Sequence, residues 1–256
     1  MTLLCARLSR WALWEDTNGQ ASLTLHTSEN TSAVSHPSVQ NDLARSIKPG
    51  WRRRLDLFGR AAAETLTQML TLADNPHIVF CSRHGNINRT VKLLHQVVTN
   101  EALSPADFSM SVHNAFVGIA SINWSITQSH TAIAAGNDSL IAGLTETICQ
   151  MMATQSPVIL CYVDLPLPDV YANTFAEPQT GVAFAMRVEP DKAITPEPPG
   201  IGKALTFSSC GADQAQAAAT SPYDQIKNLT AFFVSPSARP LTLGSSTTAW
   251  TVSRHD

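Results

Sequence analysis

The distribution of basic residues limits what this chain can fold into more than any other feature of its sequence. No Lys or Arg occurs between Lys92 and Arg187, a stretch of 94 residues in which an even spread of the 17 basic residues would place about six. Soluble domains keep Lys and Arg almost entirely on their surfaces, so a long stretch without them has little surface of its own in water. The middle of the chain is therefore expected to be core, or to be covered by another molecule.

The overall composition argues against several classes of protein. Charged residues make up 14% of the chain, against about 25% in an ordinary soluble domain. A net charge of −3 gives no field that attracts polyphosphate, which argues against a nucleic-acid partner. Apolar residues make up 44% of the chain, which is too many for a disordered protein.

Neither a membrane span nor a metal site is indicated. No apolar run approaches the ~20 residues needed to cross a bilayer, and Arg7 and Arg10 interrupt the apolar start that a signal peptide would need. A cytoplasmic protein is expected. The five cysteines include no close pair, which predicts reduced thiols and excludes a CxxC zinc or redox motif. The eight histidines are scattered without ligand spacing, so neither a metal nor another cofactor is predicted.

Short apolar runs alternate with amphipathic segments along the chain. Strands are predicted at 3–14, 77–82, 131–135, 156–164, 180–188 and 241–252, and helices at 51–73, 86–98, 137–152 and from Ser221 onward. The first strand is expected to have one face in water, because its apolar residues fall at odd positions. The polar stretch 15–50 is expected to be a long surface excursion. Strands that alternate with helices indicate an α/β sheet covered by helices.

The strand at 131–135 and the helix after it have the architecture of a nucleophile site. A sharp turn between a strand and a helix lifts a side chain above the sheet, where the helix amino terminus stabilises an anion. The turn holds Gly136, Asn137 and Asp138, with Ser139 one step into the helix, so its apex carries no nucleophile. An ordinary strand-to-helix turn with a flexible glycine accounts for the same pattern.

Three segments resemble the N-terminal half of a β-ketoacyl synthase: FCSRHGNINRTVKLLHQVV (80–98), LSPADFSMSVHNAFVGIAS (103–121) and AIAAGNDSLIAGLTE (132–146). They are most similar to the short synthase-like proteins called chain length factors, which are encoded with type II polyketide systems such as those making aryl polyenes. The resemblance implies an α/β, thiolase-like fold, mainly the N-terminal half of a ketosynthase with a shortened C-terminal part. The implied organisation is a ketosynthase-like half at 1–190, a Pro/Gly-rich linker at 191–202, and a short C-terminal helix and strand at 203–256 that pack on the same domain.

The same resemblance implies a subunit without catalytic activity of its own. In active ketosynthases the turn carries a cysteine; Ala135 and Ser139 match the residues around it, but Gly136 stands at the cysteine position. A full ketosynthase also has a second half that supplies two histidines, and the only histidine after the linker is His255. Claisen condensation by this chain alone is therefore not expected. The implied role is that of a chain length factor that forms a heterodimer with an active β-ketoacyl synthase and meets acyl carrier protein through the complex.

Proteins of this family pair through the strand beside the turn and the adjoining helices, and each partner contributes to the end of the other's acyl tunnel. The segment 108–135 is therefore expected to be largely buried by a second chain, and 108–128 contains no ionised group. The interface and tunnel candidates are Met110, Val112, His113, Asn114, Phe116, Asn137 and Ser139. Two alternatives are structural: Phe116 as a simple core residue, and His113 with Asn114 as a buried hydrogen-bonded pair that fixes a helix start.

Basic residues are concentrated just before the gap. Nine of the 17 lie between positions 41 and 92, against four of the 20 acidic residues. Because acyl carrier proteins are acidic, Arg52, Arg53 and Arg54 are candidates for docking one. A solvated helix face accounts for the same charges.

Two other functions stay open at this point. Ser139 with His113 or His130 could act as an independent serine-type acyl-thioester hydrolase, although the sequence contains no GxSxG motif. The chain could also be a stand-alone module that binds acyl carrier protein.

Overall fold

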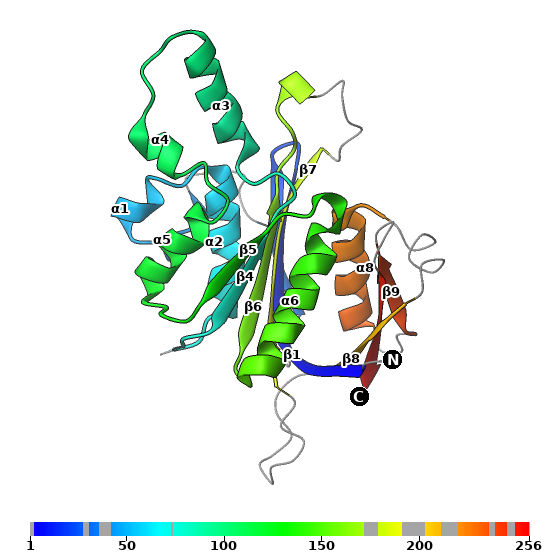
Figure 1. Cartoon of the computed structure of the whole chain (residues 1–256). Helices are drawn as coiled ribbons and strands as arrows, with labels where there is room; N and C mark the ends of the chain where they lie inside the picture. The colour runs from blue at the N-terminus through cyan, green and yellow to red at the C-terminus, as the bar shows by residue number, and fades with distance from the viewer. Residues whose placement is uncertain are drawn as a thin grey trace.

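The computed structural model describes residues 3–27, 31–35, 42–72, 74–171, 179–190, 203–210, 220–235, 239–244 and 249–255. Ten strands among them form one mixed sheet with helices on both faces (Figure 1). Along the sheet the order is β5 (His130–Ile133), β4 (His77–Cys81), β6 (Val158–Asp164), β7 (Thr180–Glu189), β1 (Leu3–Thr17), β8 (Lys203–Ser209), β10 (Ala249–His255) and β9 (Leu241–Gly244). β2 (Gln20–Thr27) pairs with β1, and β3 (Thr31–Ser35) pairs with β2.

The central strands are buried on both faces, which explains much of the gap in basic residues. In β6, Val158, Leu160 and Tyr162 belong to the apolar core on one face of the sheet. Ile159 and Cys161 alternate with them and belong to the core on the other face. A strand covered by helices on both faces has no position for a charge, so it is apolar throughout.

Two helices cover each face of the sheet. α2 (Leu57–Met69) and α5 (Ala115–Trp124) pack on one face, and α6 (Ser139–Thr154) and α8 (Pro222–Val234) pack on the other (Figure 1). The helix predicted at 51–73 is wrong in its extent, because the chain forms α1 (Pro49–Arg52) and then α2. The break occurs where the Asp56 carboxylate accepts a hydrogen bond from the Gly59 N–H and begins a new helix.

The N-terminal region also differs from the prediction. The expectation of one wet face for β1 is wrong, since Trp11, Ala12, Leu13 and Trp14 are all buried. The stretch 15–50 was expected to be a surface excursion, but it contains β2 and β3. Asn18 and Gly19 join β1 to β2 with φ of 53° and 80°, the left-handed pair that a two-residue hairpin turn requires.

A helical arm follows β4. It consists of α3 (Ile87–Val98) and α4 (Pro105–Ser109), and it stands away from the sheet (Figure 1). Ser104 caps α4, with its hydroxyl accepting from the Asp107 N–H. Arg89 ties the arm to the body, because its guanidinium lies 3.0 Å from the Asp56 carboxylate and 2.8 Å from the Asp107 carboxylate.

The C-terminal segment extends the same sheet. β8 pairs with the first half of β1, β10 pairs with β8, and β9 lies at the outer edge. The strand predicted at 241–252 is instead two strands, β9 and β10, and β8 was not predicted. The linker predicted at 191–202 lies outside the described residues. No helix within the described ranges has both the length and the apolar character that crossing a membrane requires.

Candidate functional site

The three parallel strands β5, β4 and β6 have their carboxyl ends side by side. β4 runs parallel to β5 and to β6, so Cys81, Ile133 and Asp164 all lie at the carboxyl end of these strands. β5 is the last strand on its side, and no described strand pairs with its outer edge. The turn that follows β5 is therefore placed at a corner of the sheet, beside an open strand edge.

Gly136 forms the apex of that turn. It begins the single 3-10 turn Gly136–Asp138 that leads into α6, and its φ is +57°. A Cβ placed on Gly136 would meet no atom within 4 Å. The apex is thus an open, left-handed position that suits glycine and would hold a side chain only with backbone strain.

Ser139 stabilises the turn rather than facing solvent. Its side chain is fully buried, and its hydroxyl donates to the Gly136 carbonyl at 2.7 Å and accepts from the Ala135 N–H at 2.9 Å. Both bonds connect the turn to the first residue of α6. The hydroxyl proton is committed to a backbone carbonyl.

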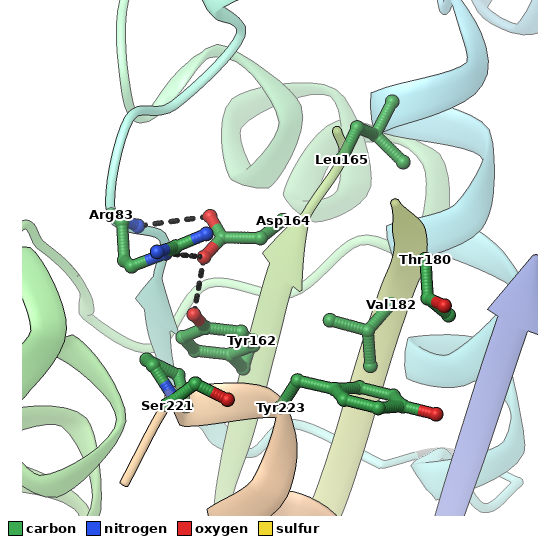
Figure 2. A pocket seen from close by; sticks show the side chains of 9 residues that line it. Arg83, Tyr162, Asp164, Leu165, Thr180, Val182, Ser221 and Tyr223 are labelled. Atoms are coloured by element: carbon green, nitrogen blue, oxygen red, sulfur yellow. Dashed lines mark hydrogen bonds and ion pairs between the residues drawn. The ribbon is translucent and has the colours of Figure 1, made fainter. Parts of the chain in front are cut away.

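A buried ion pair lies directly behind the turn. The Arg83 guanidinium contacts the Asp164 carboxylate at 2.6 Å, and both side chains are less than 10% exposed (Figure 2). The Ser82 hydroxyl and the Arg83 N–H donate to the same carboxylate at 2.9 and 3.0 Å, and the Tyr162 hydroxyl donates to it as well. Arg83 also reaches the Asn137 side-chain oxygen at 3.5 Å. The ends of β4 and β6 are therefore tied to the turn after β5.

The surroundings of this ion pair determine its chemistry. Burial, followed by the adjacent Asp164 charge, raises the pKa of the Tyr162 hydroxyl well above its usual value, so Tyr162 stays a neutral donor. Burial likewise raises the pKa of the Cys81 thiol and raises that of Cys161 to about 12. Neither buried cysteine is a thiolate at neutral pH, which excludes both as nucleophiles in this conformation.

His113 contacts the end of the edge strand. Its Nε2 lies 2.9 Å from the Ile133 carbonyl oxygen and donates to it, and its ring packs edge-on against Phe80. Asn114 is exposed and makes no side-chain cap bond at the start of α5. The alternative of a buried His113–Asn114 pair that fixes a helix start is therefore wrong.

The remaining interface candidates separate into two groups. Met110 and Phe116 are buried within this chain, at 9% and 2% exposure. Val112 is 48% exposed, and Asn137 is exposed beside the apex. Only the second group has side chains that a partner could contact.

The basic residues at the end of α1 form a smaller surface than the sequence suggests. Arg53 and Arg54 are exposed, with Arg54 4.7 Å above the Trp51 ring, and Arg52 is half-buried. Several of the nine basic residues are paired with acids of this chain: Arg45 with Asp42, Arg83 with Asp164, Arg89 with Asp56 and Asp107, and Lys92 with Asp107.

The geometry does not assemble the alternative hydrolase. The hydrogen bonds of Ser139 go to Ala135 and Gly136, and that of His113 goes to Ile133, so the two side chains are not joined. His130 begins β5, about 10 Å along the strand from its end at Ile133. No serine–histidine pair is formed among these three residues.

Arg83 and Asp164 were not singled out from the sequence as site residues. Asp164 is the last residue of the buried strand β6, and Arg83 lies two residues after the buried strand β4 ends. A charged residue in that position is a usable signal, because it must pair or reach water.

The fold and the turn can be compared with known proteins. The family model described as the N-terminal domain of β-ketoacyl synthase matches residues 20–252. The chain belongs to the β-ketoacyl synthase family. A comparison with curated proteins finds no match.

Solved ketosynthase complexes share this fold. The structure of the ketosynthase ApeO in complex with its chain length factor ApeC from Xenorhabdus doucetiae contains a chain that is 21% identical, with a TM-score of 0.69. The match covers 98% of this chain and 100% of that one. The ishigamide ketosynthase/chain length factor gives 13% identity and a TM-score of 0.56, covering 85% of this chain and 70% of that one. At these identities the similarity establishes the fold, and it confirms the predicted thiolase-like α/β class.

Proposed function

We propose that this member of the β-ketoacyl synthase family is a non-catalytic chain length factor. It pairs with an active β-ketoacyl synthase and shapes the acyl tunnel of the complex in polyketide biosynthesis, with aryl polyenes as the product class. The observation that carries the proposal is the open corner of the sheet: an unpaired edge strand that ends in a turn with Gly136 at the nucleophile position.

The character of the edge strand supports pairing with a second chain. β5 and the two residues after it, His130 to Ala135, contain no Asp, Glu, Lys, Arg or Pro. Exposed strand edges are normally protected by such residues, by bulges or by a covering element. An unprotected edge is suited to continue the sheet into a partner strand.

Exposed apolar side chains gather on the elements next to this edge. Seven large apolar residues between positions 94 and 122 are exposed: Leu94, Val97, Val98, Leu103, Phe108, Val112 and Ile122. They lie on the α3–α4 arm, on the segment after it and on α5. Soluble monomers seldom expose large contiguous apolar patches, so this concentration supports a protein partner.

Within this proposal the exposed candidates act at the partner and the buried ones act within the chain. Val112 and Asn137 contact the partner at the end of its tunnel. Met110, Phe116 and Ser139 hold the shape of the surface from inside. Arg53 and Arg54, with Arg52 beside them, attract an acidic acyl carrier protein to the complex by long-range charge.

Co-expression with an active β-ketoacyl synthase of an aryl polyene system tests the proposed function. We expect a 1:1 complex by size-exclusion chromatography with light scattering, and products whose length distribution changes when this chain is omitted. Two separately eluting proteins, together with unchanged product lengths, would contradict the proposal.

The hydrolase alternative has its own test. Purified chain without a ketosynthase is incubated with acyl-thioester substrates, and no hydrolysis above buffer is expected. Turnover that disappears in Ser139→Ala would favour the hydrolase.

A further inference from the structure

The carbonyl of Ile133 is held by two donors from different parts of the chain. The Ser82 N–H donates to it at 3.2 Å as the last bond of the β4–β5 ladder. The His113 Nε2–H donates to it at 2.9 Å from the segment before α5. A carbonyl oxygen has two lone pairs, so both bonds can form at once. After this residue the chain enters the exposed segment 134–137 that contains the apex of the turn.

The two donors belong to one chain of hydrogen bonds across the sheet. The Ser82 hydroxyl donates to Asp164 at 2.9 Å, and the Gly85 N–H donates to the Ser82 hydroxyl at 2.9 Å. Asp164 in turn holds Arg83. The Ile133 carbonyl thus connects His113 to the buried polar network of Ser82, Asp164 and Arg83 at the carboxyl ends of β4 and β6.

The position of His113 is itself closely fitted. Its ring packs against Phe80, with 5.6 Å between the ring centroids. On its other side Gly85 has a φ of +61°, and a Cβ placed there would lie 2.8 Å from the His113 Nδ1. Glycine at position 85 therefore leaves the space in which the imidazole can direct Nε2 at Ile133.

We propose, on the basis of the pairing proposed above, that His113 is a positioning residue for the heterodimer. Its bond to the Ile133 carbonyl fixes the path of the chain at the point where β5 ends and its pairing with β4 stops. That path sets where Ala134, Ala135 and Gly136 meet the partner. His113 thus acts from behind the strand, through Ile133, rather than by lining the partner's tunnel itself.

Two substitutions of His113 and one of Gly85 test this role. In His113→Gln the amide nitrogen lies near the former Nε2 and can still donate to Ile133. In His113→Leu the volume is kept and the donor is lost. Gly85→Ala keeps the imidazole, but the new Cβ would lie 2.8 Å from its Nδ1, so the ring must shift away from its bond to Ile133. His255→Leu is the control, because His255 on β10 bonds to Thr206 on β8, far along the sheet from β5.

The first measurement is the dissociation constant of the heterodimer. A hydrogen bond contributes about 1 kcal/mol net, so His113→Leu and Gly85→Ala are expected to raise Kd about fivefold. His113→Gln is expected to stay within about twofold of the native protein, and His255→Leu should match the native protein. The length distribution of the product is expected to broaden in His113→Leu and to be restored in His113→Gln.

The second measurement uses the isolated chain and so does not depend on a partner. Hydrogen–deuterium exchange of the backbone at 134–138 is expected to accelerate about fivefold in His113→Leu, while β6 stays protected. If the native chain pairs with no ketosynthase, the proposed function fails, and this exchange experiment still tests the hydrogen bond. Equal Kd and exchange in the native, Leu and Gln proteins, or a Gln variant as defective as the Leu variant, would overturn the positioning role.

Discussion

The strands at the two ends of the main run of the sheet, β5 and β9, are equally short but differently protected. β5 and β9 each have four residues. β9 is preceded by Arg239 and Pro240, both exposed, and a charge and a proline are common devices against edge-to-edge association. β5 has no such residue on or beside it, and the segment that precedes it, from α3 to α5, carries exposed apolar side chains. The difference indicates that the sheet is closed at β9 and left open for a partner at β5.

The largest effect is expected from placing the same charge on both edges. Ala132 is exposed in β5 and Thr242 is half-buried in β9. In Ala132→Glu a carboxylate would be buried at the junction without a partner, which costs several kcal/mol, so the heterodimer is expected to weaken by at least a hundredfold. Thr242→Glu should leave Kd unchanged. Isothermal titration with the ketosynthase measures both variants, and equal losses in the two would remove the distinction between the edges.

The next effect concerns what holds the open edge in place. Asp164→Asn keeps the shape of the side chain but leaves Arg83 buried without a counter-charge, which is expected to lower the free energy of unfolding by about 3 kcal/mol. Asp42→Asn, in the exposed pair with Arg45, should change it by less than about 0.5 kcal/mol. Urea unfolding followed by circular dichroism compares the two. Similar small losses in both would mean that the network behind β5 is not an anchor.

The sequence predicted the central sheet and the turn better than it predicted their connections. Strands such as β4 and β6 were identified because they are apolar on both faces, a signal contained within a few residues. Gly136 was placed correctly at a strand-to-helix turn, because that signal too is contained within a few residues. The pairing of Arg83 with Asp164 joins residues 81 positions apart. The bond from His113 to Ile133 depends on how the segment before α5 packs against the end of β5. No local pattern specifies either contact.

The errors in the fold have local causes. The β1–β2 hairpin was missed because the polar composition after residue 15 suggested a loop, although Asn18–Gly19 is a hairpin signal. The break between α1 and α2 was missed because apolar residues continue at helical spacing across it, while the cap formed by Asp56 decides the new start. In both cases a turn or cap residue outweighed the apolar pattern.

A moderate effect is expected from the α3–α4 arm. Val98 is 80% exposed on the arm, and Leu72 is fully exposed before the start of β4, at the opposite end of that strand from the arm. Because an apolar side chain buried at an interface contributes about 1.5–3 kcal/mol, Val98→Glu should weaken the heterodimer by about tenfold to a hundredfold. Leu72→Glu should have no effect on Kd. An unaffected complex in Val98→Glu would confine the interface to β5 and α5.

The smallest effect on stability is expected at the apex itself. Gly136→Cys finds open space, and the cost is the left-handed backbone, about 1–2 kcal/mol. The new thiol would stand at the start of α6, where the helix dipole favours a thiolate. Alkylation with iodoacetamide should therefore modify one more cysteine than in the native chain, in which Cys5 and Cys149 are exposed and Cys81 and Cys161 are buried.

Restoring the thiol is not expected to restore condensation. His113 Nε2 is bonded to the Ile133 carbonyl and His255 is bonded to Thr206 on β8, so neither histidine is placed to act on an acyl unit at position 136. Gly136→Cys should accept an acyl group from a thioester without extending it, as mass spectrometry of the intact chain would record. Chain extension by this variant alone would show that the turn after β5 is a complete active site lacking only its nucleophile. The interpretation of β5 as an edge that serves only for pairing, in contrast to β9, would then have to be abandoned.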